Sequence, residues 1–226
     1  MSSLALTTPQ GTLWEIRDAT WALSRRAELP GARLFDMTAD ALRRARDAGL
    51  SPMDRLTFAR TASWLVNSPA HVRVLRRWAL PPNDALWLSL FGALEGGPSR
   101  WSTGETRDEV KALLSALGAN ATTAPAEPYL VEATSKVLAL VFPELVPLMP
   151  PLACTFLHGD GAGSATPETF VATLDWFAEA VTSHHAALQA IASAHKEVPL
   201  EAAQALDRML WFDSDGHRHF PPPPGA

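Results

Sequence analysis

The sequence lacks several features that would decide a class of protein at once. Cys154 is the single cysteine among 226 residues, which excludes an internal disulfide and a cysteine-based zinc site. No apolar run approaches the roughly 18 residues of a membrane helix, since residues 137–157 contain four prolines and Glu144. The first residues also lack the basic start and apolar middle of a signal peptide. We therefore expect a soluble, cytoplasmic protein.

Motifs for nucleotide binding and for hydrolysis are missing too. The chain contains no G-x-x-x-x-G-K-[ST], no G-x-G-x-x-G and no G-x-S-x-G. No motif predicts a cofactor, and no catalytic residue is predicted from a motif. Alternating apolar and polar residues flanked by hairpin turns are absent as well, so we expect no sheet. The sequence predicts an all-α fold.

Apolar residues at helical spacing, together with capping residues and breakers, divide the chain into elements. Helices are expected over about 13–23, 39–48, 52–66, 69–78, 84–94, 105–117, 128–141, 167–194 and 200–211. The predicted organisation is a flexible leader over residues 1–11, one helical domain over 12–220 and a disordered proline-rich tail over 221–226. Loops allow two lobes, with a boundary near residues 96–128.

The most apolar stretch runs from residue 127 to residue 158 and contains prolines at 143, 147, 150 and 151. Its first half is apolar around much of a helical circumference, which is typical of a central, buried helix. That helix carries Lys136, the only lysine between Lys111 and Lys196, and Glu132 lies four residues before it in the favoured order for an ion pair. A buried lysine can also act as a nucleophile, so Lys136 is a candidate catalytic residue. Pro150 and Pro151 predict an extended link.

Positive charge is concentrated near the start of the chain. Residues 14–78 contain twelve arginines against seven acids, whereas the whole chain has a net charge of −5. Candidate residues for binding a macromolecule are the arginine pairs Arg25, Arg26, Arg43, Arg44, Arg76 and Arg77. The alternative is that these arginines lie on the polar faces of helices, where arginine is a soluble helix former.

With eight tryptophans and no recognisable active site, the chain reads as a non-enzymatic, macromolecule-binding module of bacterial origin whose partner is another protein. Nucleic acid is a less favoured partner because the chain is acidic overall.

Histidines give a further alternative, a metal-dependent hydrolase. His184, His217 and His219 are its candidate ligands, with Asp215 nearby in sequence. His217 and His219 are two residues apart and would need further ligands from elsewhere in the fold. The competing interpretation is a solvated chain end and a partly buried His184.

Two segments carry a resemblance to a known family. ATSKVLALVFPELVPLM, residues 133–149, and ALDRMLW, residues 205–211, resemble bacterial uncharacterised proteins related to the helix-hairpin-helix DNA glycosylase fold. In those proteins a Ser-Lys helix leads to a proline turn and an aspartate, and a closing helix carries an Asp and a Trp. The resemblance covers about residues 132–226, and it implies a DNA-associated protein with Lys136 and Asp207 at its cleft.

The chain departs from that family pattern at one position. Met149-Pro150-Pro151 stands where the related proteins have the aspartate, and the glycosylase hairpin is not recognisable. The resemblance therefore implies that glycosylase chemistry is absent.

Overall fold

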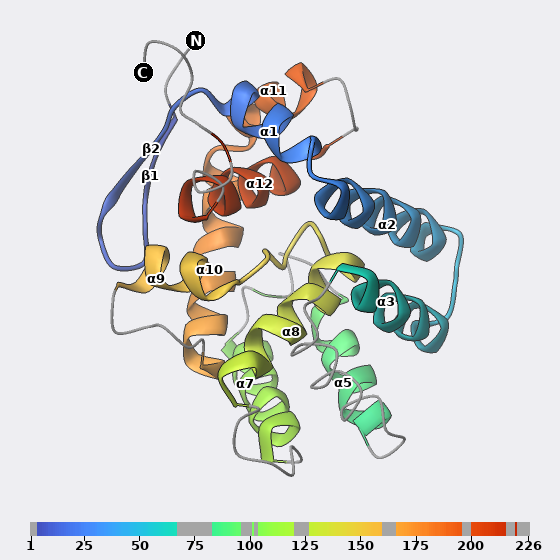
Figure 1. Cartoon of the computed structure of the whole chain (residues 1–226). Helices are drawn as coiled ribbons and strands as arrows, with labels where there is room; N and C mark the ends of the chain where they lie inside the picture. Colours follow the sequence, from blue (N-terminus) through green and yellow to red (C-terminus); the bar gives the residue numbers. More distant parts are fainter. Residues whose placement is uncertain are drawn as a thin grey trace.

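The computed structural model describes residues 4–66, 83–95, 101, 104–119, 127–159, 166–195, 200–215 and 220. Within these residues the chain forms ten helices and one two-stranded sheet, so the predicted all-α class is confirmed apart from that small sheet (Figure 1). The helices are α1 (Ala19–Ala27), α2 (Pro30–Asp47), α3 (Pro52–Val66), α5 (Asp84–Leu94), α7 (Gly104–Ala119), α8 (Glu127–Val141), α9 (Pro151–His158), α10 (Pro167–Ser183), α11 (His185–Ala194) and α12 (Ala202–Ser214). The helix expected over 69–78 and the tail over 221–226 lie outside the described residues.

The sheet stands where the sequence predicted a flexible leader and the first helix. Strands β1 (Leu4–Thr7) and β2 (Leu13–Ile16) pair antiparallel. Side chains of a strand alternate between its two faces, so Leu6 and Trp14 face the protein interior while Leu13 points to solvent. Gly11 allows the connecting turn, since its φ of 83° is a conformation that glycine adopts without a steric penalty. The hairpin therefore belongs to the folded core.

Helix α2 is longer than the capping pattern indicated. The expected start was at residue 39, but the helix begins at Pro30, where proline suits the first helical position because its missing N–H is not needed there. Gly49, with a φ of 86°, follows its end as expected. The nine additional residues bring the first turns of α2 next to α1 and α12.

Helix α8 is the central buried helix that its composition predicted. It packs against α2, α3 and α7, and every residue from 131 to 142 is buried except Lys136. At its end, Phe142 lies edge-on against Phe91 of α5, with ring centroids 5.3 Å apart. Lys136 is therefore the one side chain in this segment that reaches towards solvent.

Residues 143–150, called the elbow below, turn the chain away from α8. The N–H groups of Leu145 and Val146 bond to the carbonyl of Phe142, so one helical turn forms between the prolines. The extended link expected after Pro150 is wrong, because α9 begins at Pro151. A proline at the first helical position starts a helix as readily as an earlier proline ends one.

The long helix predicted over 167–194 is two helices. Helix α10 ends at Ser183, and α11 starts at His185 after a break at His184, whose φ of −117° is not helical. Helix α11 then packs on α12. The break turns the chain so that the last two helices lie together.

Buried apolar residues form two clusters. One lies among α2, α3, α5, α7 and α8, and the other joins the hairpin, α1, α9, α11 and α12. Helix α10 contributes Phe170 to the first cluster and Phe177 to the second. In Figure 1 the first and last elements of the chain, blue and red, accordingly lie side by side, and α8 lies in the middle.

Candidate functional site

Lys136 marks the candidate site because it is the one partly exposed residue in a buried helix segment. Its side chain is 18% exposed, and its Nζ donates a hydrogen bond to Oε1 of Glu132 at 2.9 Å. Glu132, one turn earlier, is 8% exposed. The sequence predicted this pair, and the structure places it at the wall of a pocket.

The pocket has a volume of about 430 Å³, within the range typical of small-molecule sites. It opens between the α1–α2 connection, α8, the elbow and the end of α12. Charged lining residues are Arg26, Glu132, Lys136 and Asp215, and apolar ones are Leu29, Ala32, Phe35, Leu148, Pro150 and Trp211, with Gly31 between them. It will be called the Lys136 pocket. Apolar walls with a few charged groups are the usual composition of a ligand site.

A buried ion network lies beside the Lys136 pocket. Arg26 Nη1 bonds to Asp36 at 2.5 Å, and Arg208 pairs with both Asp36 and Asp207. All four side chains are at most 7% exposed. The guanidinium groups also stack on aromatic rings, Arg26 over Trp211 at 5.7 Å and Arg208 over Phe35 at 5.4 Å. The network therefore fixes two aromatic walls of the pocket.

The two carboxylates of this network differ in their ionisation. Burial opposes ionisation of Asp36, but the charges of Arg208 and Arg26 outweigh it and hold its pKa below the usual range. At Asp207 burial is the larger effect and raises the pKa, against the opposing charges of the same arginines. The cluster is thus arranged around one strongly anionic carboxylate, Asp36.

Side chains from two helices hold the elbow in place. Oδ1 of Asp207 accepts the N–H of Leu148 at 2.7 Å, and Oγ of Ser135 accepts the N–H of Met149 at 3.1 Å. Ser135 in turn donates to the carbonyl of Glu132 at 2.8 Å. These bonds satisfy buried backbone donors that the prolines leave outside regular structure.

Lys136 and Asp207, the residues singled out by the family resemblance, therefore lie in the same part of the fold but have different surroundings. Lys136 lines the pocket, whereas Asp207 is 2% exposed and is engaged by Leu148 and Arg208. A ligand in the pocket can reach Lys136 but not Asp207.

Comparisons with protein-family models, with curated proteins and with solved structures found no match. The resemblance to glycosylase-related proteins accordingly stays a prediction. Along the described parts of the chain, no helix has the length and apolar character that a membrane span requires.

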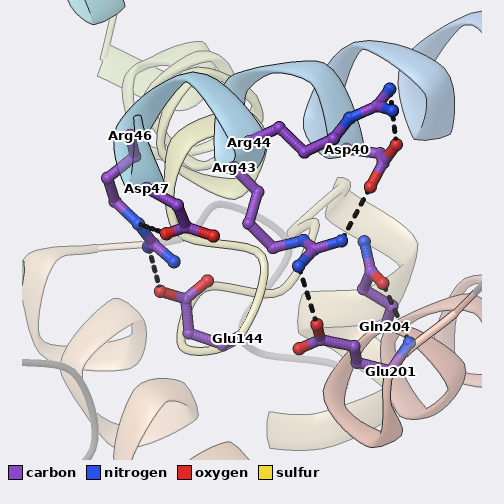
Figure 2. A network of polar contacts seen from close by, with 8 residues as sticks. All are labelled: Asp40, Arg43, Arg44, Arg46, Asp47, Glu144, Glu201 and Gln204. Carbon is purple, nitrogen blue, oxygen red and sulfur yellow. Dashed lines mark hydrogen bonds and ion pairs between the residues drawn. The ribbon is translucent and has the colours of Figure 1, made fainter. Parts of the chain in front are cut away.

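The arginines predicted to bind a macromolecule are engaged within the chain wherever the structure describes them. Arg25 pairs with Glu28, and Arg26 belongs to the buried network. On α2, Arg43 bridges Asp40 and Glu201, and Arg44 pairs with Asp40 (Figure 2). Arg76 and Arg77 lie outside the described residues.

Figure 2 shows what this surface network joins. Arg43 reaches from α2 to Glu201 at the start of α12, and Arg46 reaches to Glu144 in the elbow. Glu201 also takes part in a capping box with Gln204. The network thus connects α2 to both segments that position Asp207 and Leu148.

Of the three candidate metal ligands, His184 alone lies among the described residues. His184 lies at the break between α10 and α11. There it lines a hollow of about 530 Å³ between β1 and α10, to which α10 contributes Asp175 and Glu179. Asp175 there already accepts bonds from Trp101 and Arg107. Over the described ranges no three His, Cys, Asp or Glu side chains are grouped to hold a metal ion, and His217 and His219 lie outside those ranges.

Sequence reasoning missed Asp36, Arg208 and Phe35 as parts of the site. One signal was present: Asp207 and Arg208 are adjacent charges inside an apolar run, between Leu206 and Met209. Adjacent charges of opposite sign amid apolar residues indicate a buried ion pair, since an unpaired charge there would be costly. Asp36 had no comparable signal.

Cys154 is expected to be chemically inert in the folded protein. The thiol is buried, and burial together with the nearby charge of Glu132 raises its pKa to about 12. The reactive thiolate is therefore scarce at neutral pH. Ellman's reagent at pH 8 should label the native protein only slowly and the urea-unfolded protein completely. Fast labelling of the native protein would contradict the buried position.

Proposed function

We propose that the protein is a non-enzymatic binding protein that holds a small amphipathic organic molecule in the Lys136 pocket. One observation carries the proposal: a pocket of about 430 Å³ combines apolar and aromatic walls with the Glu132–Lys136 ion pair. Apolar walls supply affinity by burial, and a few charged groups orient the ligand.

Binding without catalysis is the better supported assignment. Of the two aspartates in the resemblance pattern, the one after the proline turn is replaced here by proline. The other, Asp207, is buried and accepts the N–H of Leu148, so it does not face a ligand as an acid or base. Lys136 has its partner in Glu132. A charged, paired amine is suited to holding a ligand rather than attacking it, because a nucleophilic lysine must be neutral.

Binding of a macromolecular partner, which the sequence predicted, remains a second candidate function. Leu34 and Met37, one turn apart on α2, are 39% and 55% exposed and would give a partner protein an apolar contact. Association with DNA has less support, because Arg25, Arg26, Arg43 and Arg44 are paired with carboxylates of the chain.

The pocket can be tested by filling it. Gly31 lines the pocket and lies in the first turn of α2, and a Cβ added there meets no atom of the described residues within 4 Å, so Gly31→Phe should fold and occupy the space. We expect the amphipathic dye ANS (anilinonaphthalene sulfonate) to bind the wild type saturably. Gly31→Phe should weaken that binding about tenfold or more, a loss of about 1.4 kcal/mol.

Gly92 provides the matched control. It also lies in a helix, α5, and a Cβ added there likewise meets no atom within 4 Å among the residues that the structure describes, but it is not part of the pocket lining. Gly92→Phe should bind ANS like the wild type, with both variants checked for helical content by circular dichroism. Equal dye binding by all three proteins, or none by the wild type, would overturn the proposed function.

A further inference from the structure

We infer that the ligand of the Lys136 pocket is a zwitterionic α-amino acid with a large apolar side chain; this inference rests on the proposed function. Its starting point is the charge of the lining. Arg26 and Lys136 are balanced there by Glu132 and Asp215. A balanced lining disfavours a multiply charged ligand of either sign, such as a nucleotide, because like charges at short range repel.

The arrangement of these charges fits a ligand that carries both signs close together. Nζ of Lys136 and Oε1 of Glu132 are 2.9 Å apart, side by side on one face of α8. The ammonium and carboxylate of an α-amino acid are likewise adjacent, on one carbon atom. A single such headgroup can place its carboxylate on Lys136 and its ammonium on Glu132, making charge-assisted hydrogen bonds to both.

Partial burial makes those bonds selective. Glu132 is 8% and Lys136 18% exposed, so little water competes with a ligand for them. Electrostatic interactions are stronger in such surroundings than on an open surface. A ligand that lacks one of the two charges would cover the Glu132–Lys136 pair while bonding to only one of its members, so it would bind less tightly than a ligand that bonds to both.

The remaining walls define the other end of the ligand. Phe35, Leu148, Pro150 and Trp211 are apolar or aromatic, and the stacked guanidinium of Arg26 fixes Trp211 in place. The volume of about 430 Å³ is near the lower limit for ligand pockets, which favours a molecule of about one residue rather than a longer peptide. A large apolar side chain, aromatic or branched, would fill this part.

Calorimetric titration with L-phenylalanine and with three related compounds tests the inference. N-acetyl-L-phenylalanine lacks the positive charge, L-phenylalanine amide lacks the negative charge, and glycine lacks the side chain. We expect L-phenylalanine to bind, and the affinity of each relative to be lower by a factor of about ten or more. Equal binding of the acetylated compound or the amide would overturn the assignment of a zwitterion.

Substitution of Lys136 supplies a readout that a general loss of structure would not imitate. Lys136→Met should weaken L-phenylalanine but leave its amide almost unchanged, because the amide has no carboxylate for Lys136 to bind. Lys136→Arg should keep part of the preference for L-phenylalanine over its amide. If both compounds weaken to the same extent, the role assigned to Lys136 is wrong.

The dye experiment separates this inference from the proposed function. If ANS binds and Gly31→Phe blocks it, but none of L-phenylalanine, L-leucine and L-tryptophan displaces the dye or gives heat, the pocket binds another class of ligand and the inference fails alone. If Gly31→Phe binds both ANS and L-phenylalanine as well as the wild type does, the pocket is not the site and both the inference and the proposed function fail.

Discussion

Replacement of Arg208 by methionine is expected to lower the free energy of unfolding by about 3–5 kcal/mol. Arg208 is buried and pairs with both Asp36 and Asp207, so its removal leaves two buried carboxylates with Arg26 as the remaining cation of the described network. Methionine keeps the unbranched apolar stem of arginine and carries no charge, so the measured loss reports the missing guanidinium group. Urea denaturation followed by circular dichroism measures the change.

Two further variants keep this prediction testable. Arg44→Met on α2 removes an arginine whose side chain is 70% exposed and should cost less than about 1 kcal/mol. Adding Asp207→Asn to Arg208→Met should recover part of the loss, since it removes one uncompensated charge while the amide oxygen can still accept the N–H of Leu148. A loss below about 1 kcal/mol for Arg208→Met would mean that water screens the network.

Trp14→Ala should be comparably destabilising, by about 3–5 kcal/mol. Trp14 is 5% exposed, lies edge-on to Phe156 with ring centroids 5.5 Å apart, and donates its indole N–H to Asp213 at 2.6 Å. Alanine would leave a cavity where the hairpin meets α9 and would leave Asp213 without this donor. Thermal and urea unfolding both report the loss.

The neighbouring residue is the control. Leu13 precedes Trp14 in β2, points to the opposite face and is 61% exposed, so Leu13→Ala should change stability by less than about 0.5 kcal/mol. In the helix predicted for this segment, Leu13 would face the core. A large effect of Leu13→Ala with a small effect of Trp14→Ala would therefore support the helix and contradict the hairpin.

That segment illustrates where sequence patterns were insufficient. Leu13 and Ile16 are three apart, which suits one face of a helix, while Trp14 and Ile16 are two apart, which suits one face of a strand. Strands of four residues are too short for the two periods to be separated. The pairing with β1 decides, and pairing is a property of two segments that no single window contains.

Elements with strong local signals were predicted closely. Helix α8 ends before Pro143, since the residue preceding a proline avoids the helical conformation, and α5 and α8 both lie within one residue of their expected bounds. The break at His184 has no proline or glycine beside it. It coincides with the packing of α11 on α12, which is a tertiary effect.

The candidate site was predictable only in part. Lys136 is conspicuous in an apolar helix and Glu132 is at pairing distance, so both could be found from spacing. The pocket itself needs the start of α2 and the end of α12, which supply Gly31 and Trp211 from distant parts of the sequence. Spacing along a chain carries no information about such distant neighbours.

The contacts of the hairpin also set an order on folding. Trp14 bonds to Asp213, 199 residues later, and Thr7 accepts the indole N–H of Trp176. During synthesis the hairpin therefore emerges long before its partners, and the second apolar cluster cannot close until α12 has left the ribosome. Contacts of such sequence separation slow folding, because a long loop must close before they form. The first cluster contains no residue beyond α10, so it can assemble before α12 is made and serve as the surface on which the hairpin and α12 come together.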